Sequence, residues 1–258
     1  CNAVTWLFNK GISGATIYAL NTDALHLSVT KADDKILIGK ELTRGLGAGG
    51  LPNRGREAAK EAISDIKRAV SGSDMVFIIA GMGGGTGTGA APVVAQLAKE
   101  SGAVVIAVVT MPFEMEKARI DKAEFGLQEL REVVDTAIVL DNNRLVDIAG
   151  NLPIEQAFAV ANELVAVMIK GIVETITLPS LINLDYADVS AIMKNGGVAV
   201  IGVGEADTTD RVNEAVKQAL THPLLDVDYK GATGALIHIT CGPDLKLEEF
   251  DQIGRIVA

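Results

Sequence analysis

The chain has 258 residues, enough for one large domain or two moderate ones around a substantial core. Hydrophobic residues make up 48% and charged residues 22%, which is typical of an ordinary soluble globular protein. The net charge of −10 argues against a surface for nucleic acid or for an anionic membrane as the main function.

Neither a membrane span nor a disulfide is predicted. No apolar run approaches the ~20 residues that a transmembrane helix needs, so we expect no direct membrane insertion. Cys1 and Cys241 lie far apart in the sequence and without metal-ligand spacing. We expect unpaired thiols in a reducing cytoplasm.

Apolar strands alternate with amphipathic helices over the first 150 residues, which predicts an α/β fold: a parallel sheet with helices on both faces. The expected strands cover 16–20, 35–38, 75–80, 104–109 and 136–140, and the expected helices include 56–70 and 89–99. The chain opens directly on a helix with no strand before it. This opening suggests that an N-terminal piece is absent.

One long helix is predicted over 153–177, because its apolar residues keep helical spacing throughout. At 1.5 Å per residue it forms a rod of roughly 36 Å. A second, smaller α/β region follows, with strands expected near 198–203 and 236–240 and helices near 209–220 and 247–257. We therefore divide the chain into 1–150, 151–178 and 179–258. The last region ends on a helix, so its sheet is expected to be incomplete.

The most informative motif is the run Gly81-Met82-Gly83-Gly84-Gly85-Thr86-Gly87-Thr88-Gly89, which follows an apolar strand and opens a helix expected to start near Gly89. Glycine lets the backbone adopt conformations that a β-carbon forbids and approach a ligand closely. A helix N-terminus adds unpaired N–H groups and a positive dipole end. Strand, glycine loop and helix together predict a phosphate cradle rather than a flexible turn.

Two common nucleotide motifs do not account for this cradle. The Walker sequence G-x-x-x-x-G-K-[ST] does not occur. The string at 45–50 fits G-x-G-x-x-G, but residues 39–44 separate it from the preceding strand, and 85–90 fits only the relaxed form. Such matches arise by chance in glycine-rich loops.

Five motifs in the correct order resemble FtsZ, the family of tubulin-related cell-division GTPases, in its archaeal forms. They are the glycine run, Asn21-Thr22-Asp23, the loop 43–49, Asn183-Leu184-Asp185-Tyr186-Ala187-Asp188-Val189 and Met193-Lys194-Asn195-Gly196-Gly197. The resemblance covers essentially the whole chain. It implies a tubulin-like GTP-binding domain over 1–150, a central helix over 151–178 and an activation domain over 179–258. It also implies head-to-tail polymerisation into protofilaments at the division site in mid-cell.

The resemblance assigns a role to specific positions. Phosphate contacts fall on Gly83, Gly84, Gly85, Thr86, Gly87 and Thr88, the γ-phosphate loop on Gly47, Ala48 and Gly49, and further nucleotide contacts on Asn2, Asn21, Asp23, Pro112, Glu116 and Arg119. Asn142, Phe158 and Asn162 match the guanine pocket, with Phe158 stacking on the base. The implied ligands are GTP and GDP with associated Mg²⁺ or K⁺. Other cell-division proteins and membrane adaptors are expected to bind through regions outside this chain.

Asp185, Asp188 and Asn183 match the catalytic acidic loop of the family. The spacing alone also allows structural roles for these residues. Asp185 with Asp188 forms a typical helix-cap pattern, and Asn21 and Asp23 can cap the helix that begins at residue 24. The loop 43–49 can be a simple connector. Phe158, which lies on an apolar stripe, reads by itself as a core residue.

The length of the rod supports the catalytic reading. If Phe158 touches the nucleotide near one end of the ~36 Å helix, Asp185 lies beyond the other end. The carboxylates would then act only on a nucleotide held by a neighbouring copy. The alternative hypothesis is a non-catalytic nucleotide-binding or scaffold module, impaired by the missing first strand and first glycine loop. The choice of GTP over ATP depends on the resemblance.

Overall fold

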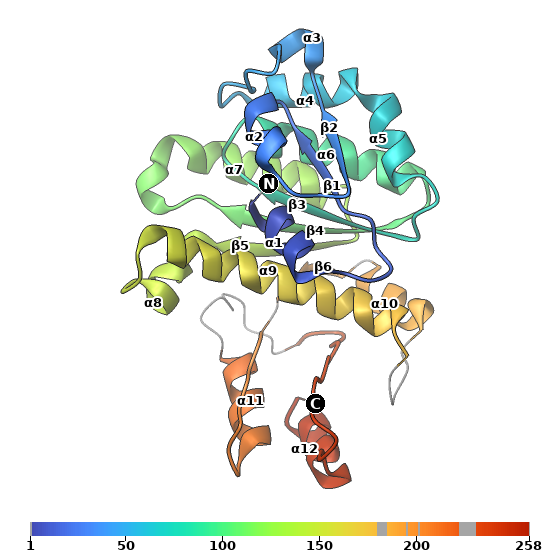
Figure 1. Cartoon of the computed structure of the whole chain (residues 1–258), viewed down its shortest axis with the longest axis vertical. Helices are drawn as coiled ribbons and strands as arrows, with labels where there is room; N and C mark the ends of the chain where they lie inside the picture. Colours follow the sequence, from blue (N-terminus) through green and yellow to red (C-terminus); the bar gives the residue numbers. More distant parts are fainter. Residues whose placement is uncertain (1, 180–184, 195, 201, 222–230, 258) are drawn as a thin grey trace. The chain divides into compact units, whose positions relative to one another are not determined.

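The computed structural model describes residues 2–179, 185–194, 196–200, 202–221 and 231–257. Contacts divide the chain into two compact units, Cys1–Ala199 and Val200–Ala258 (Figure 1). We placed the start of the activation domain at residue 179, whereas the contact boundary falls after Ala199. The cause is strand β6 (Gly197–Ala199), which pairs with the sheet of the first unit.

All strand pairs in the described residues are parallel, and they form two sheets in the orders β1-β2 and β3-β4-β5-β6. The remaining strands are β1 (Tyr18–Asn21), β2 (Asp34–Leu37), β3 (Met75–Gly81), β4 (Val104–Met111) and β5 (Thr136–Asp141). The five strands predicted for the first 150 residues are thus confirmed to within two residues at each end. Their carboxyl ends point toward the same edge, where ligands of such sheets bind.

Helices surround these strands. They are α1 (Asn2–Lys10), α2 (Ala24–Val29), α3 (Lys40–Thr43), α4 (Pro52–Glu61), α5 (Ile63–Val70), α6 (Thr86–Glu100), η1 (Glu114–Glu116), α7 (Lys117–Arg131), η2 (Asn142–Arg144), α8 (Leu145–Ala149), α9 (Ile154–Thr177) and α10 (Tyr186–Met193). The helix predicted over 56–70 is two helices, because the backbone leaves the helical region at Ala62 (φ −100°, ψ 20°). Ala62 belongs to a buried cluster formed by residues of α4, α5, α6 and β2.

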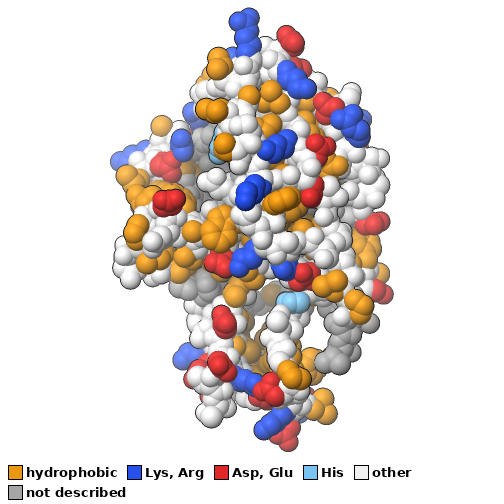
Figure 2. Space-filling view, viewed as in Figure 1, with side chains coloured by type: hydrophobic (Ala, Val, Ile, Leu, Met, Phe, Trp, Pro, Cys, Tyr) orange, Lys and Arg blue, Asp and Glu red, His pale blue; other side chains and the backbone are white. Residues whose placement is uncertain are grey.

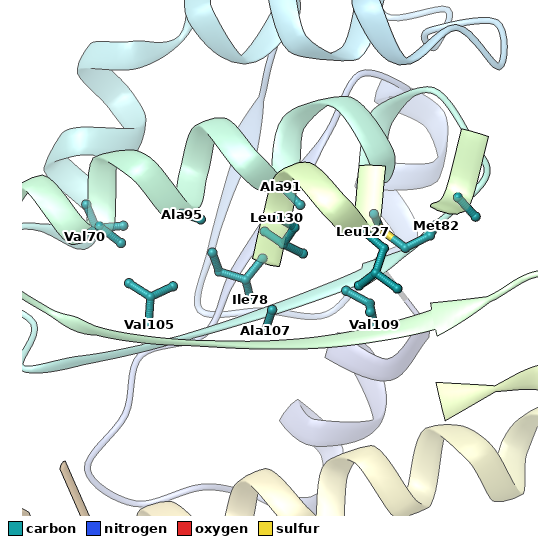
Figure 3. Packing of buried hydrophobic residues seen from close by; sticks show 12 residues of the cluster. Val70, Ile78, Met82, Ala91, Ala95, Val105, Ala107, Val109, Leu127 and Leu130 are labelled. Carbon is teal, nitrogen blue, oxygen red and sulfur yellow. The ribbon is translucent and has the colours of Figure 1, made fainter. Parts of the chain in front are cut away.

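The core lies on both faces of the larger sheet. Residues Val104 to Val109 of β4 are buried on alternating sides, as expected for a strand covered on both faces. On one face, α6 and α7 pack over the sheet, and side chains such as Ile78, Val105 and Leu130 meet there (Figure 3). Helix α9 covers the opposite face (Figure 1). The predicted arrangement of helices on both faces is confirmed.

Helix α9 has 24 residues, as the apolar periodicity predicts. By length and composition it could cross a membrane, with a mean hydropathy of 1.5 over 18 residues. Its buried residues, which include Ala161, Val165, Ile169 and Val173, make it a core helix of the first unit.

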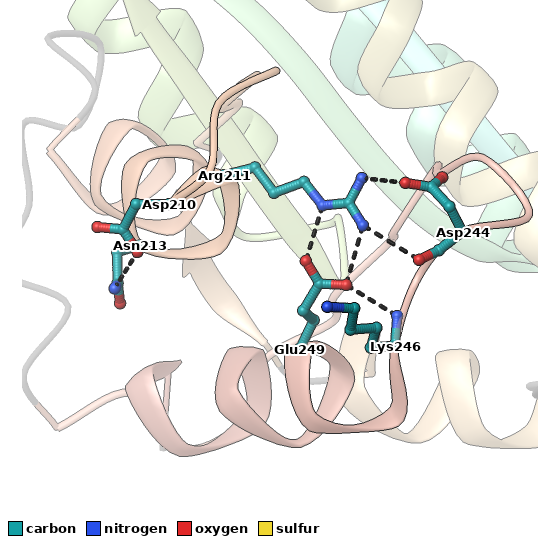
Figure 4. A network of polar contacts seen from close by, with 6 residues as sticks. All are labelled: Asp210, Arg211, Asn213, Asp244, Lys246 and Glu249. Carbon is teal, nitrogen blue, oxygen red and sulfur yellow. Dashed lines mark hydrogen bonds and ion pairs between the residues drawn. The ribbon is translucent and has the colours of Figure 1, made fainter.

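The second unit contains α11 (Arg211–Leu220) and α12 (Leu247–Val257). The strand predicted over 236–240 is wrong, because this segment pairs with no other strand among the described residues. An ionic network joins the two helices: Arg211 donates hydrogen bonds to Glu249 at 2.8 and 2.9 Å and to Asp244 at 2.7 Å (Figure 4). These bonds lower the pKa of Glu249 to about 2.

Candidate nucleotide site

The glycine run connects β3 to α6 at the carboxyl edge of the sheet. Helix α6 begins at Thr86, three residues before the predicted start at Gly89. Gly83 has φ +90°, a left-handed conformation that favours glycine, and its N–H donates to Thr88 Oγ1 at 2.9 Å. The run is therefore a short loop of fixed conformation rather than a flexible turn.

Space around this loop is open on one side only. A β-carbon on Gly85 would lie 2.8 Å from the Ala48 methyl group, and one on Gly87 would overlap the carbonyl oxygen of Gly81. A β-carbon on Gly84 would meet no atom within 4 Å. Gly85 is the N-cap of α6 and makes no side-chain capping bond, so the first N–H groups of a 15-residue helix remain available beside this open space. These features fit a phosphate group.

The loop 44–50 lies against the glycine run. Arg44 and four glycines of this loop have positive φ, and Ala48 is buried next to Gly85. Thr22 joins the two loops although its own role was not predicted: its hydroxyl is 2.6 Å from Thr86 Oγ1, and its carbonyl accepts from Gly47 N–H at 3.1 Å. The sequence signals for Thr22 are its place in the Asn21-Thr22-Asp23 motif and its polar side chain just after an apolar strand.

Asn21 and Asp23 flank Thr22 at the end of β1. Asp23 caps α2, because its carboxylate accepts from His26 N–H at 2.9 Å, so the cap reading is confirmed. Asn21 Oδ1 accepts from Asp23 N–H at 3.1 Å and its amide nitrogen lies 3.3 Å from His26 Nδ1. Both side chains are thus held at the carboxyl edge, and their nucleotide role stays a prediction.

Pro112, Glu116 and Arg119 follow β4 at the same edge. Glu116 and Arg119 form an ion pair of 2.7 Å across one helical turn. Glu116 also accepts from Phe113 N–H at 3.1 Å. A β-carbon on Gly83 would meet Arg119 at 2.9 Å and Pro112 at 3.4 Å, so these two residues line the side of the cradle.

The three residues predicted for the guanine pocket lie after β5 and at the start of α9. Phe158 is 39% exposed and meets Phe113 edge-on at 5.8 Å, so its reading as a core residue is wrong. Asn162 follows one turn later, and neither it nor Asn142 has a side-chain hydrogen bond to the described residues. The neighbouring Asn143 is the residue that ties this loop to Glu114 N–H, at 2.9 Å.

For two further predicted residues the functional role stays a prediction. Asn2 is exposed in the first turn of α1, and its side chain makes no hydrogen bond to the part of the chain that the structure describes. Asn183 lies outside the described residues.

Asp185 and Asp188 lie at the opposite edge of the sheet. Asp185 caps α10 by accepting from Asp188 N–H at 2.9 Å, which confirms the cap reading. The hydroxyl of the next residue, Tyr186, donates to the carbonyl of Asp74 at 2.7 Å, and Asp74 immediately precedes β3. Both carboxylates are exposed.

The length of β3 separates the acids from the cradle. Its seven residues, at a rise of ~3.3 Å each, separate Gly81 by about 23 Å from Asp74, which the Tyr186 hydroxyl contacts. A carboxylate side chain spans only a few ångströms. The acidic loop therefore cannot reach a phosphate bound at the glycine run of the same molecule.

A glycine cradle at the carboxyl edge of a parallel sheet, bordered by loops from β1, β4 and β5, is typical of nucleotide-binding α/β proteins. Comparisons with known proteins specify the family. Residues 2–150 match the "Tubulin/FtsZ family, GTPase domain", and residues 197–258 match the "FtsZ family, C-terminal domain".

Curated relatives and a solved structure agree. Cell division protein FtsZ 2 of Methanocaldococcus jannaschii is 57% identical over 98% of this chain and 68% of its own length. FtsZ 2 of Halobacterium salinarum is 58% identical over 98% of this chain and 64% of its own length. The structure titled "FtsZ dimer, empty (M. jannaschii)" superposes with a TM-score of 0.94 at 55% identity, over 99% of this chain and 75% of that one. The chain belongs to the FtsZ family and spans about two thirds of the length of these relatives.

Proposed function

We propose that this protein binds GTP at the carboxyl edge of its sheet and hydrolyses it when a second copy supplies Asp185 and Asp188. The observation that carries the proposal is the separation of cradle and acids by the full length of β3. A phosphate in the cradle is out of reach of the acids in the same molecule. Head-to-tail stacking places the amino edge of one copy against the carboxyl edge of the next.

The residues divide the chemistry between the two edges. The N–H groups at the start of α6, with Thr86 and Thr88, would bind and orient the phosphates, and Phe158 would stack on the base. Asp185 and Asp188 would position the attacking water, since positioning and electrostatics carry most of phosphoryl transfer. Mg²⁺ or K⁺ would be held largely by the phosphates. Among the described residues, no three His, Cys, Asp or Glu side chains form a metal-binding group.

Exposed apolar side chains beside the cradle support contact with a second copy. Leu46 is 84% exposed in the loop 44–50, and Leu25 of α2, which packs near it, is 79% exposed. Apolar side chains are interspersed with acidic and basic ones on the face shown in Figure 2. Apolar surface rimmed by polar groups is typical of protein–protein contacts. The proposed setting is a cytoplasmic filament at the division site.

A mixing experiment with the full chain tests the proposal. Gly84→Val places a side chain in the open space of the cradle without a clash in the fold, and should abolish GTP binding. A double variant, Asp185→Asn with Asp188→Asn, should bind GTP but not hydrolyse it. Each protein alone should be inactive.

A 1:1 mixture should recover activity, because a head-to-tail interface can combine the intact cradle of one variant with the intact acids of the other. Random assembly forms this pairing in about a quarter of interfaces, which sets the upper limit of recovery. A mixture no more active than its components would overturn hydrolysis by a neighbouring copy. Unimpaired hydrolysis by the double variant would remove the acids from the mechanism.

A further inference from the structure

Lys122 of α7 contacts the loop 44–50 at its least supported point. Its ammonium group donates to the carbonyl oxygen of Gly50 at 2.8 Å, and the two residues are 72 positions apart in the sequence. Gly49 and Gly50 have φ of +63° and +69°, and a β-carbon on either would meet nothing within 4 Å. Among the described residues, this is the one hydrogen bond that either glycine makes.

The rest of the loop is anchored on the side of β1 and the glycine run. Gly45 O accepts from Ala24 N–H at 3.0 Å, Gly47 N–H donates to Thr22 O at 3.1 Å, and Ala48 is buried against Gly85. Between Ala48 and the start of α4 at Pro52, the chain makes a turn closed by the Leu51 N–H to Ala48 O hydrogen bond, and a β-carbon on Gly49 or Gly50 would meet nothing within 4 Å. Lys122 therefore holds residues 49 and 50 from the side of α7, opposite the contacts that Gly45 to Ala48 make with β1 and the glycine run.

A second contact on the same face of α7 supports this role. Glu129 lies seven residues, or two helical turns, after Lys122, so both side chains leave α7 toward the segment 50–56. Glu129 forms a partly buried ion pair with Arg56 of α4. Helix α7 thus contacts the loop 44–50 through Lys122 and helix α4 through Glu129.

We propose that Lys122 is a positioning residue that holds Gly49 and Gly50 in place for the terminal phosphate of the bound nucleotide. This inference rests on the proposed function, because it assumes a nucleotide in the cradle. Gly49 and Gly50 are the central residues of a turn that Leu51 N–H closes onto the carbonyl of Ala48 at 3.2 Å, and Lys122 supplies the contact that ties this turn to α7. Its loss should release the loop without altering the glycine run, which has its own bonds.

The test compares Lys122→Met with Lys122→Arg and with Lys60→Met in the full chain. Methionine keeps most of the aliphatic stem and removes the charge. Lys60 of α4 pairs with the exposed Glu57, its one ionic partner among the described residues, so Lys60→Met makes the same charge change away from the loop. The first readout is amide hydrogen exchange of residues 47–51 without nucleotide. The second is affinity for GDP and for a non-hydrolysable GTP analogue below the assembly concentration.

In Lys122→Met, exchange at 47–51 should rise at least fivefold, and affinity for the GTP analogue should fall about tenfold against less than twofold for GDP. Lys122→Arg should restore both, and Lys60→Met should match the wild type. Unchanged exchange would overturn the proposal, as would an equal loss for both nucleotides, which indicates a general charge effect. If the wild type binds neither nucleotide, the proposed function fails, whereas the exchange readout still tests the Lys122 contact.

Discussion

Substitution of Asp185 separates its structural role from its proposed catalytic role. The carboxylate caps α10 through one hydrogen bond of 2.9 Å to Asp188 N–H. Loss of an Asp N-cap to Ala costs typically ~1 kcal/mol, whereas Asn caps about as well as Asp. Asp185→Ala should therefore lower stability by about 1 kcal/mol, and Asp185→Asn by a few tenths from the lost charge at the helix dipole, as in other capped helices.

The thermal effect follows from the size of the first unit. An unfolding entropy of ~2.1 cal/mol/K per residue over a unit of this size converts 1 kcal/mol into a shift of about 2–4 °C. We expect such a shift for Asp185→Ala and less than ~1 °C for Asp185→Asn. GTP turnover should instead fall in both variants alike, by at least ~100-fold, as when an electrostatic group of an active site is removed.

The assays are differential scanning calorimetry, GTP turnover above the assembly concentration and calorimetric GTP titration below it. GTP affinity should be unchanged in both variants, because the cap lies near the amino end of β3 and the cradle follows its carboxyl end, about 23 Å away along the strand. Wild-type turnover by Asp185→Asn would show that the carboxylate only caps the helix. Weakened GTP binding would refute the placement of acids and cradle at opposite edges.

Three further outcomes are expected. Gly89→Ala should lower Tm by several degrees, because the new methyl group would overlap a backbone carbonyl of α4. This clash outweighs the ~1 kcal/mol gained in helix propensity. Gly84→Ala is the matched control and should change Tm by no more than about 1 °C. Phe158→Ala should weaken GTP binding by about 1–3 kcal/mol with little change in Tm, because the ring is 39% exposed; equal affinities by titration would remove it from the base pocket. The hydrogen bonds from Arg211 lower the pKa of Glu249 in the folded protein from 4.5 to about 2. The stability contributed by this pair is therefore complete above about pH 4.5 and is lost as the pH falls toward 2. If the α12 amide signals of Arg211→Gln titrate with acid as those of the wild type do, this expectation is wrong.

The strands and α9 were predictable because their signals are local. A continuous apolar run such as that of β4 allows few structures other than a buried strand, and 24 residues with helical apolar spacing define α9. The strand expected over 236–240 shows the limit of this reasoning. A strand exists only where a neighbour pairs with it, and an apolar run carries no information about that neighbour.

Tertiary contacts decided the features of the site that the sequence left open. Gly87 suggested a loop by propensity, yet it lies in α6, where the nearby carbonyl of Gly81 leaves no room for a β-carbon. Phe158 matches an apolar stripe in sequence but is exposed in space. Thr22 and Lys122 act through partners 64 and 72 positions away, and the local sequence does not identify these partners.

The structure gives a different reason for the separation of cradle and acids than the sequence did. From the sequence, it depended on Phe158 and Asp185 lying at opposite ends of one long helix. In the structure, it depends on β3, with Gly81 at one end and the Tyr186 contact at the other. A strand that pairs with its neighbour β4 over its whole length is a stiffer spacer than the ends of a helix joined by a loop. The two edges are therefore fixed relative to each other, and a neighbouring copy is the only source of carboxylates from this loop for the cradle.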